Sequence, residues 1–257
     1  MTNDEIMEDL VKNCKKRLNL LLFFWYLGFL FVTLRHRTKQ QNNNSKGVNS
    51  MKKIMFNDRF GLTEKVLDGS KIQTRRIIPQ SVINKVDEFR VEYYNMTFDA
   101  LTVEEALHQY FFVEKNLGKL PYKVGEIVAI AQSYKEVFGE DCGKESETGY
   151  TNKMFVKPEL MPHQIRITDV RIERLQDISE EDVLKEGFDV GFDFEVTGES
   201  VTKGFCLDYR NKNEKGIRCI FDLCAQNAYS MLIDAISSKG TWDSNPFVFV
   251  YDFELVK

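Results

Sequence analysis

The chain has 257 residues, of which 43% are apolar and 29% charged, a composition typical of a globular protein that buries a core. Residues 1–50 hold eight basic and four acidic side chains, which leaves 27 basic and 35 acidic ones for residues 51–257. The resulting net charge of −8 after residue 50 argues against binding to long duplex DNA, which requires a broad basic surface. A small, local basic site remains compatible with this charge.

The cysteines lack the even count and the density of a disulfide scaffold, so we expect reduced, mostly buried thiols in a cytoplasmic protein. No histidine follows His163, and closely spaced ligand pairs are missing, so the sequence predicts no metal site. It also has no Gly-rich phosphate loop, and we expect no cofactor. The cysteines are Cys14, Cys142, Cys206, Cys219 and Cys224.

An apolar run, Leu18–Leu34, is flanked by basic residues on both sides. Its 17 residues reach the lower limit for crossing a bilayer, so a membrane anchor is one interpretation. The alternative is that residues 1–50 are a translated leader. The polar segment Gln40–Ser50 is unlike a folded segment, and Lys46-Gly47-Val48 can be encoded by a ribosome-binding sequence just ahead of the Met51 codon. In that case the working protein begins at Met51, and native expression would yield few peptides from residues 1–50.

The first expected elements after Met51 are a short strand near residues 53–56 and a helix over residues 62–68 that Gly69 ends. Ile77-Ile78-Pro79 breaks the pattern. Residues 80–120 form an expected insertion that contains a helix at Val103–Tyr110. Gly125 then makes a turn into a strand buried on both faces, Ile127–Ala131.

A second long strand is expected around Ile165–Ile172, where a slip in the alternation indicates a bulge. Ser179 begins a short helix that stops at Gly187. Residues 189–220 form a hairpin-rich insertion, an amphipathic helix starting near Phe221 ends at Gly240, and residues 247–255 alternate as a final strand. Separated strands with short helices between them favour an α+β fold built on a small β-barrel.

The chemical candidates gather in the segment after the first helix. Lys71 supplies an amine, Thr74 a hydroxyl, and Arg75 and Arg76 two guanidinium groups. If Lys71 and Thr74 converge, the amine can deprotonate the hydroxyl to make a nucleophile, with the arginines as anion or base ligands. The alternative is a solvated basic loop.

Two further candidates come from distant segments. Glu186, at the end of the helix after Ser179, can act as a general acid in a cleft, although a solvated position in the last turn is the default for any glutamate. Trp242 can stack on a nucleobase or cover the end of the core.

Four segments together resemble an ASCH domain of the PUA-like superfamily. They are GSKIQTRR (69–76), YKVGEIVAIAQSY (122–134), IRITDVRIERLQDISEEDVLKEGF (165–188) and KGTWDSNPFVFVYDFEL (239–255), in the family's order. The resemblance implies a PUA-like small β-barrel with flanking short helices and a cleft that binds RNA or a modified nucleoside. It covers residues 51–257, with insertions at about 80–120 and 189–220.

One branch of this family removes the acyl group from N4-acetylcytidine with a Thr–Lys–Glu set. Its G-x-K-x-x-T motif matches Gly69, Lys71 and Thr74, and the segment before its glutamate aligns with Leu175–Glu180, which places the acid on Glu186. The resemblance thus implies Thr74 as nucleophile, Lys71 as base and Glu186 as acid, without metal. We expect Arg75, Arg76 and Trp242 to bind the substrate. A non-catalytic RNA-binding module is the rival interpretation, and a membrane-tethered protein depends on Leu18–Leu34.

Overall fold

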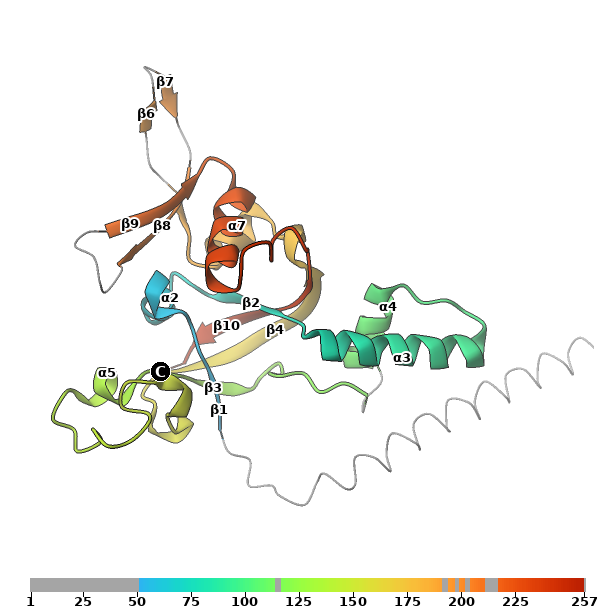
Figure 1. The fold of residues 1–257 in the computed structure, drawn as a ribbon, viewed down its shortest axis with the longest axis horizontal. Coiled ribbons are helices and arrows are strands. Elements are labelled where there is room, and N and C mark those ends of the chain that lie inside the picture. The colour runs from blue at the N-terminus through green and yellow to red at the C-terminus, as the bar shows by residue number, and fades with distance from the viewer. Residues whose placement is uncertain are drawn as a thin grey trace, which may run out of the picture. The chain divides into compact units, whose positions relative to one another are not determined.

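The computed structural model describes residues 51–256, apart from 114–116, 191–193, 197–198, 202–203 and 211–216. These residues mix helices and sheets, which confirms the α+β class. They divide into two compact units, residues 80–120 and residues 51–79 together with 121–256 (Figure 1). No helix among the described residues combines the length and the apolar character needed to cross a bilayer. The predicted anchor or leader, including Leu18–Leu34, lies outside the described residues.

The larger unit contains a five-stranded sheet in the order β1-β3-β4-β10-β2. The β1–β3 pair is parallel and the other neighbours are antiparallel. The described β1 and β2 are the two edges of this sheet and do not pair with each other, so the sheet is not closed and the expected barrel is not confirmed. The strands are β1 (Lys52–Ile54), β2 (Gln73–Ile77), β3 (Ile127–Ile130), β4 (Gln164–Arg174) and β10 (Phe247–Leu255).

The long β4–β10 pair forms the spine of the sheet and contains the bulge that the sequence indicates. Asp252 pairs with Asp169 and the next residue, Phe253, pairs with Ile167, so Thr168 is left without an opposite residue. The extra residue keeps Ile167 and Val170 buried on either side of the slip. The predicted final strand is confirmed in full.

Short helices connect the strands of this unit. Ser179 caps α6 (Glu180–Lys185) as predicted, because its Oγ accepts a hydrogen bond from the backbone N of Asp182 at 3.1 Å. The C-terminal helix begins later than predicted, since Phe221 still belongs to β9. The other helices are α2 (Leu62–Leu67), α5 (Tyr134–Phe138), α7 (Ala225–Ile236) and the 3₁₀ turns Asp58–Phe60, Lys153–Phe155, Pro158–Leu160 and Leu175–Asp177.

Hairpins form within residues 189–222. A three-stranded sheet has the order β5-β8-β9, and β6 pairs with β7. The antiparallel β8–β9 pair brings Cys206 and Cys219 together as a disulfide, with their Cα atoms 6.2 Å apart. The expectation of reduced thiols is therefore wrong for these two residues, because the sequence did not give the hairpin register. Cys142 and Cys224 are free. The strands are β5 (Asp189–Val190), β6 (Phe194–Val196), β7 (Glu199–Val201), β8 (Phe205–Arg210) and β9 (Ile217–Asp222).

The smaller unit is helical. It contains α3 (Gln80–Thr97), α4 (Val103–His108) and a π-helical turn, Gln109–Val113. A capping box between Thr102 and Glu105 begins α4, which confirms the predicted helix up to His108. Phe89 of α3 contacts the ring of Tyr110 at a centroid distance of 5.9 Å, and these rings close the small core of this unit.

Candidate active site

The segment between α2 and β2 positions the first candidate residues. Gly69 adopts the left-handed conformation expected of a helix stop, with φ of +82°. The backbone N of Lys71 then donates to the carbonyl of Lys65 at 2.8 Å, and the N of Ile72 donates to the carbonyl of Lys185 at 2.9 Å. These two bonds tie the segment to the ends of both α2 and α6, so Lys71 faces the C-terminus of α6.

Lys71 and Glu186 form a buried pair. Their side chains are only 1% and 5% exposed, and the Lys71 ammonium donates to the Glu186 carboxylate as well as to its backbone carbonyl at 3.0 Å. The next residue, Gly187, has φ of +100°, and a Cβ there would lie 3.2 Å from the Lys71 Cβ. Glycine therefore permits both the turn after α6 and the close approach of Lys71.

Burial lowers the pKa of the Lys71 amine, because desolvation disfavours its charged form. The Glu186 carboxylate opposes this shift, whereas Arg76 and Arg75 contribute to it through like-charge repulsion. The net lowering is the direction that a lysine acting as a base near neutrality requires.

The other oxygen of the Glu186 carboxylate faces two more donors. The Tyr229 hydroxyl donates to it at 3.3 Å, and Arg75 Nη1 lies 3.5 Å away. Burial, reinforced by Glu186, raises the pKa of Tyr229 well above its ordinary value, so this hydroxyl stays protonated and remains a donor. Burial alone would lower the pKa of Arg75, but the carboxylates of Glu186 and Asp182 raise it. One oxygen of the Glu186 carboxylate therefore contacts Lys71, and the other contacts Tyr229 and Arg75.

Thr74 lies on β2 opposite Tyr251 of β10 and is 5% exposed. Within the described part of the chain its hydroxyl makes no hydrogen bond, and none joins it to the Lys71 amine. Thr74, the candidate nucleophile, is therefore not held by a hydrogen bond within this part of the chain.

Arg76, two residues after Thr74, donates to the Met55 carbonyl at 2.5 Å, and its guanidinium lies 5.7 Å from the centre of the Phe56 ring.

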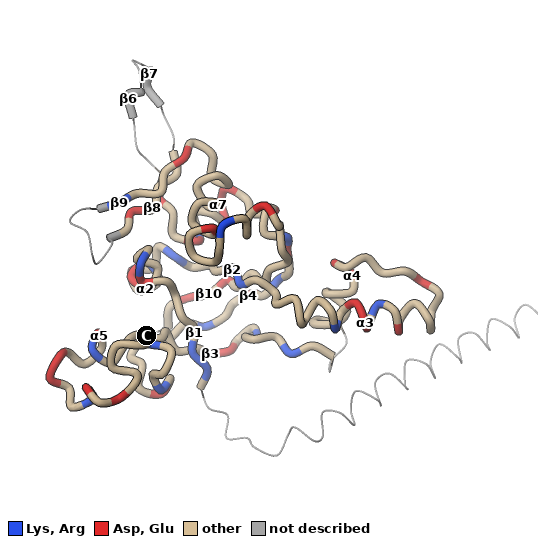
Figure 2. The backbone as a smooth tube through the Cα atoms, viewed as in Figure 1, with Lys and Arg blue, Asp and Glu red and all other residues tan. Residues whose placement is uncertain are grey.

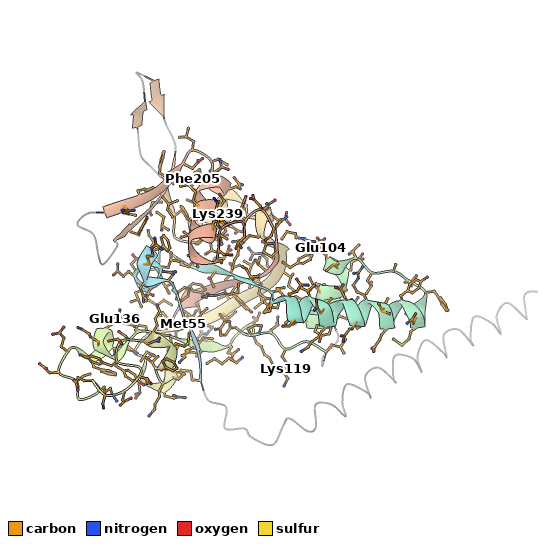
Figure 3. All side chains as sticks on the ribbon, viewed as in Figure 1. Met55, Glu104, Lys119, Glu136, Phe205 and Lys239 are labelled. Carbon is orange, nitrogen blue, oxygen red and sulfur yellow. A yellow bond between two sulfur atoms is a disulfide. The ribbon has the colours of Figure 1, made fainter. Side chains whose placement is uncertain are left out.

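A cavity of about 280 Å³ joins these groups. Most of its polar residues come from β2 and the segment before it, with Glu186 from the end of α6 and Tyr229 from α7, and its apolar residues come from α7 and several other elements. Figure 3 draws all described side chains as sticks, with Met55 labelled in the segment after β1 and Lys239 in the loop after α7. The lining includes Lys71, Thr74, Arg75, Arg76, Glu186, Tyr229, Leu62, Leu175, Leu232, Ile233, Ile236 and Val248.

Trp242 does not belong to the lining of this cavity. Its ring meets the Tyr229 ring edge-on at a centroid distance of 6.3 Å, and its backbone N donates to Asp234 at 2.9 Å. Trp242 therefore lies beside Tyr229, which is the alternative that the sequence left open, a residue at the end of the core. The substrate-binding role that we expected for it has no support from this placement.

Tyr229 and a carboxylate cluster around Arg75 and Arg171 are parts of the site that the sequence did not predict. Arg75 Nη2 contacts Asp182 at 2.7 Å and Glu173 at 3.1 Å, and Arg171 contacts Asp182 at 3.0 Å and Asp252 at 2.6 Å. One part of this cluster has a signal in the sequence. Charged residues alternate along β4, which places Arg171 and Glu173 on the same face of the strand. Nothing local in the sequence links Asp182 or Tyr229 to it.

Comparison of the chain with protein-family models, with curated proteins and with solved structures gave no match.

Proposed function

We propose that this protein binds a modified nucleoside in the cavity beside β2 and hydrolyses an N4-acyl-cytidine amide. The observation that carries the proposal is that Lys71, Thr74 and Glu186, which the resemblance to ASCH domains pairs across 112 residues, line one cavity. We also propose that the five-stranded sheet of the larger unit is arranged as in PUA-like proteins. The amine with a lowered pKa supports a base, and the adjacent carboxyl supports an acid.

A single proton transfer within the Lys71–Glu186 pair would give both side chains the protonation states that the reaction requires. Transfer of the shared proton from the ammonium to the carboxylate gives a neutral amine and a neutral carboxylic acid. The lowered pKa of the Lys71 amine favours the loss of its proton in this transfer. The amine is then the base for Thr74, and the acid is ready for the leaving group.

In the first half-reaction, the Lys71 amine takes the Thr74 proton while Thr74 Oγ1 attacks the acyl carbonyl carbon. The C–N bond then breaks, and Glu186 gives its proton to the exocyclic nitrogen, so cytidine leaves as a neutral amine and the acyl group remains as an ester on Thr74. In the second half-reaction, the Glu186 carboxylate takes a proton from water while the water oxygen attacks the ester carbon, and the Lys71 ammonium returns its proton to Thr74 Oγ1 as the ester bond breaks, which releases the carboxylic acid. The Lys71 and Thr74 side chains must first come within hydrogen-bond distance, which substrate binding is expected to bring about.

The charges around the cavity support a small ligand. Blue and red segments are scattered along the larger unit in Figure 2, and its described residues form no long blue stretch. Arg75 is already paired with Asp182 and Glu173, so Arg76 is the cavity-lining arginine without a carboxylate partner among the described residues. Together with the net charge of −8, this favours a nucleoside derivative over long RNA.

The test is to incubate the chain from Met51 with N4-acetylcytidine and to measure cytidine release by wild type, Lys71→Ala, Thr74→Ala and Glu186→Ala. Loss of turnover in all three variants, with Trp242→Ala as an active control, supports the enzyme. An inert wild type, or full turnover in Thr74→Ala, rules out the proposed mechanism.

The second candidate function is a binding module without catalysis. It is favoured by one observation, that the Lys71 ammonium is engaged twice by Glu186 and not by Thr74. In that case the buried pair stabilises the fold, and the cavity recognises a nucleobase in RNA. Wild type would then bind a short RNA containing an unpaired modified cytidine and would leave it unchanged.

A further inference from the structure

One face of the β8–β9 hairpin carries a second cluster of reactive side chains. Cys206 and Asp208 are two residues apart on β8 and share one face of the strand. The register pairs Asp208 directly with Cys219 of β9, so Cys219 lies on the same face. The alternate residues, Phe205 and Leu207, are buried on the opposite face.

The three potential ligand atoms lie close together. The two Sγ atoms and the carboxylate oxygen are all within 4.8 Å of one another, and Cys206 Sγ lies 3.2 Å from the nearer oxygen of Asp208. Tetrahedral zinc, with bonds of about 2.3 Å to sulfur and about 2.0–2.2 Å to oxygen, separates its ligand atoms by roughly 3.5–4 Å. Once the disulfide is reduced, the two sulfurs have to separate to reach this spacing, and the strand register already places all three side chains close enough to meet one ion.

The chemistry of the cluster selects the class of metal. Metal binding converts the two thiols into thiolates beside the Asp208 carboxylate, around a Cys206 that is only 2% exposed, and a divalent cation offsets the repulsion among these three negative charges. Thiolate ligands favour zinc and similar soft or borderline ions over calcium and magnesium. Asp208 and Cys219 are exposed, which leaves access for the ion and a position for water as fourth ligand.

We propose that Cys206, Asp208 and Cys219 form a redox-controlled site for zinc or a related thiophilic ion. The structure represents the oxidised state, in which the two sulfurs are bonded to each other. Two molecules of a small thiol reduce this disulfide, giving two cysteine thiols and the disulfide of the small thiol. The divalent ion then displaces both thiol protons and also binds the Asp208 carboxylate. Oxidation by a small-molecule disulfide runs the sequence backwards and releases the ion.

Cobalt(II) tests the site, because its bonds to thiolate produce an ultraviolet charge-transfer band. The full chain is reduced with a phosphine, separated from it and titrated with cobalt(II) alone. The variants are Cys219→Ser and Asp208→Asn, and Cys224→Ser is the matched control, since this free and exposed cysteine lies five residues after Cys219. Melting temperatures check that each variant is folded.

Wild type and Cys224→Ser are expected to give the band at one cobalt per chain, and zinc should displace it. Cys219→Ser should abolish the band, and Asp208→Asn should weaken binding by about tenfold or more. Oxidised wild type should bind no cobalt. The proposal is overturned if reduced wild type shows no band, if Asp208→Asn binds as tightly as wild type, or if Cys224→Ser loses the band. The Asp208→Asn variant keeps both cysteines, so it decides the question even if Cys219→Ser does not fold.

Discussion

Two cationic groups, one on β4 and one in the segment before β2, show how burial and ionic partners set the protonation state of a side chain. Arg171 on β4 is 30% exposed and contacts carboxylates of Glu173, Asp182 and Asp252, which raise its pKa although partial burial acts against this. Lys71 is 1% exposed and has one carboxylate partner, and burial lowers its pKa despite that partner. Arg171 therefore keeps its positive charge, whereas the Lys71 ammonium can give up its proton.

Removal of a carboxylate partner should therefore lower the free energy of unfolding far more for Lys71 than for Arg171. Glu186→Ala leaves a buried ammonium with only a backbone carbonyl, and we expect it to lower the free energy of unfolding by about 3–5 kcal/mol near neutral pH. Asp252→Ala removes one of several partly exposed partners of Arg171 and should cost about 1 kcal/mol or less. Chemical denaturation of both variants measures the difference, and equal losses would contradict the contrast.

Replacement of the whole pair should recover much of that loss. Lys71→Met with Glu186→Leu removes both buried charges, so the double variant should be more stable than Glu186→Ala by about 2 kcal/mol or more. The same variant should lose all turnover, since it has neither base nor acid. Denaturation and cytidine release are measured on one preparation. A double variant as unstable as Glu186→Ala would show that the pair contributes more than charge compensation.

The pH dependence of stability should report the lowered pKa of Lys71. The unfolded chain holds this proton more strongly than the folded protein, so unfolding takes up a proton at pH values between the lowered pKa and 10.5. The free energy of unfolding should therefore rise with pH within this window, and the rise should be smaller in Lys71→Met. The raised pKa of Tyr229 acts in the opposite sense only above pH 10.0, so data are compared below that value. Parallel curves for the two proteins would contradict a lowered pKa.

The smallest effect is expected at Arg76. Arg76→Gln removes a guanidinium that contacts a backbone carbonyl and an aromatic ring, so the free energy of unfolding should fall by about 1 kcal/mol. If this group contacts the ligand, KM should rise about tenfold while kcat changes less. Steady-state kinetics with N4-acetylcytidine separates the two constants. An unchanged KM would remove Arg76 from the binding site.

Local patterns in the sequence were sufficient for much of the fold. The bulge near Thr168, the cap at Ser179, the stop at Gly69 and the last strand each follow from a few neighbouring residues. The convergence of Lys71 and Glu186 came from the resemblance to a family, because no local rule relates residues 115 positions apart.

The remainder depended on register and packing. The Cys206–Cys219 pair requires the β8–β9 register, and Tyr229 reaches Glu186 only through the placement of α7. The open order of the five-stranded sheet likewise follows from long-range pairing, which alternation within single strands does not specify. Trp242 has a side chain of the type that stacks on nucleobases, but the turn after α7 places it beside Tyr229.

The most direct test of the central claim is to identify the acyl group on Thr74. Wild type in excess is mixed with N4-acetylcytidine, quenched in acid within a single turnover and digested for mass spectrometry. The account predicts an acetyl group on the peptide that contains Thr74, with free cytidine formed in equal amount, and neither in Thr74→Ala. Cytidine formed without any acylated peptide, or formed equally by Thr74→Ala, would contradict a threonine nucleophile.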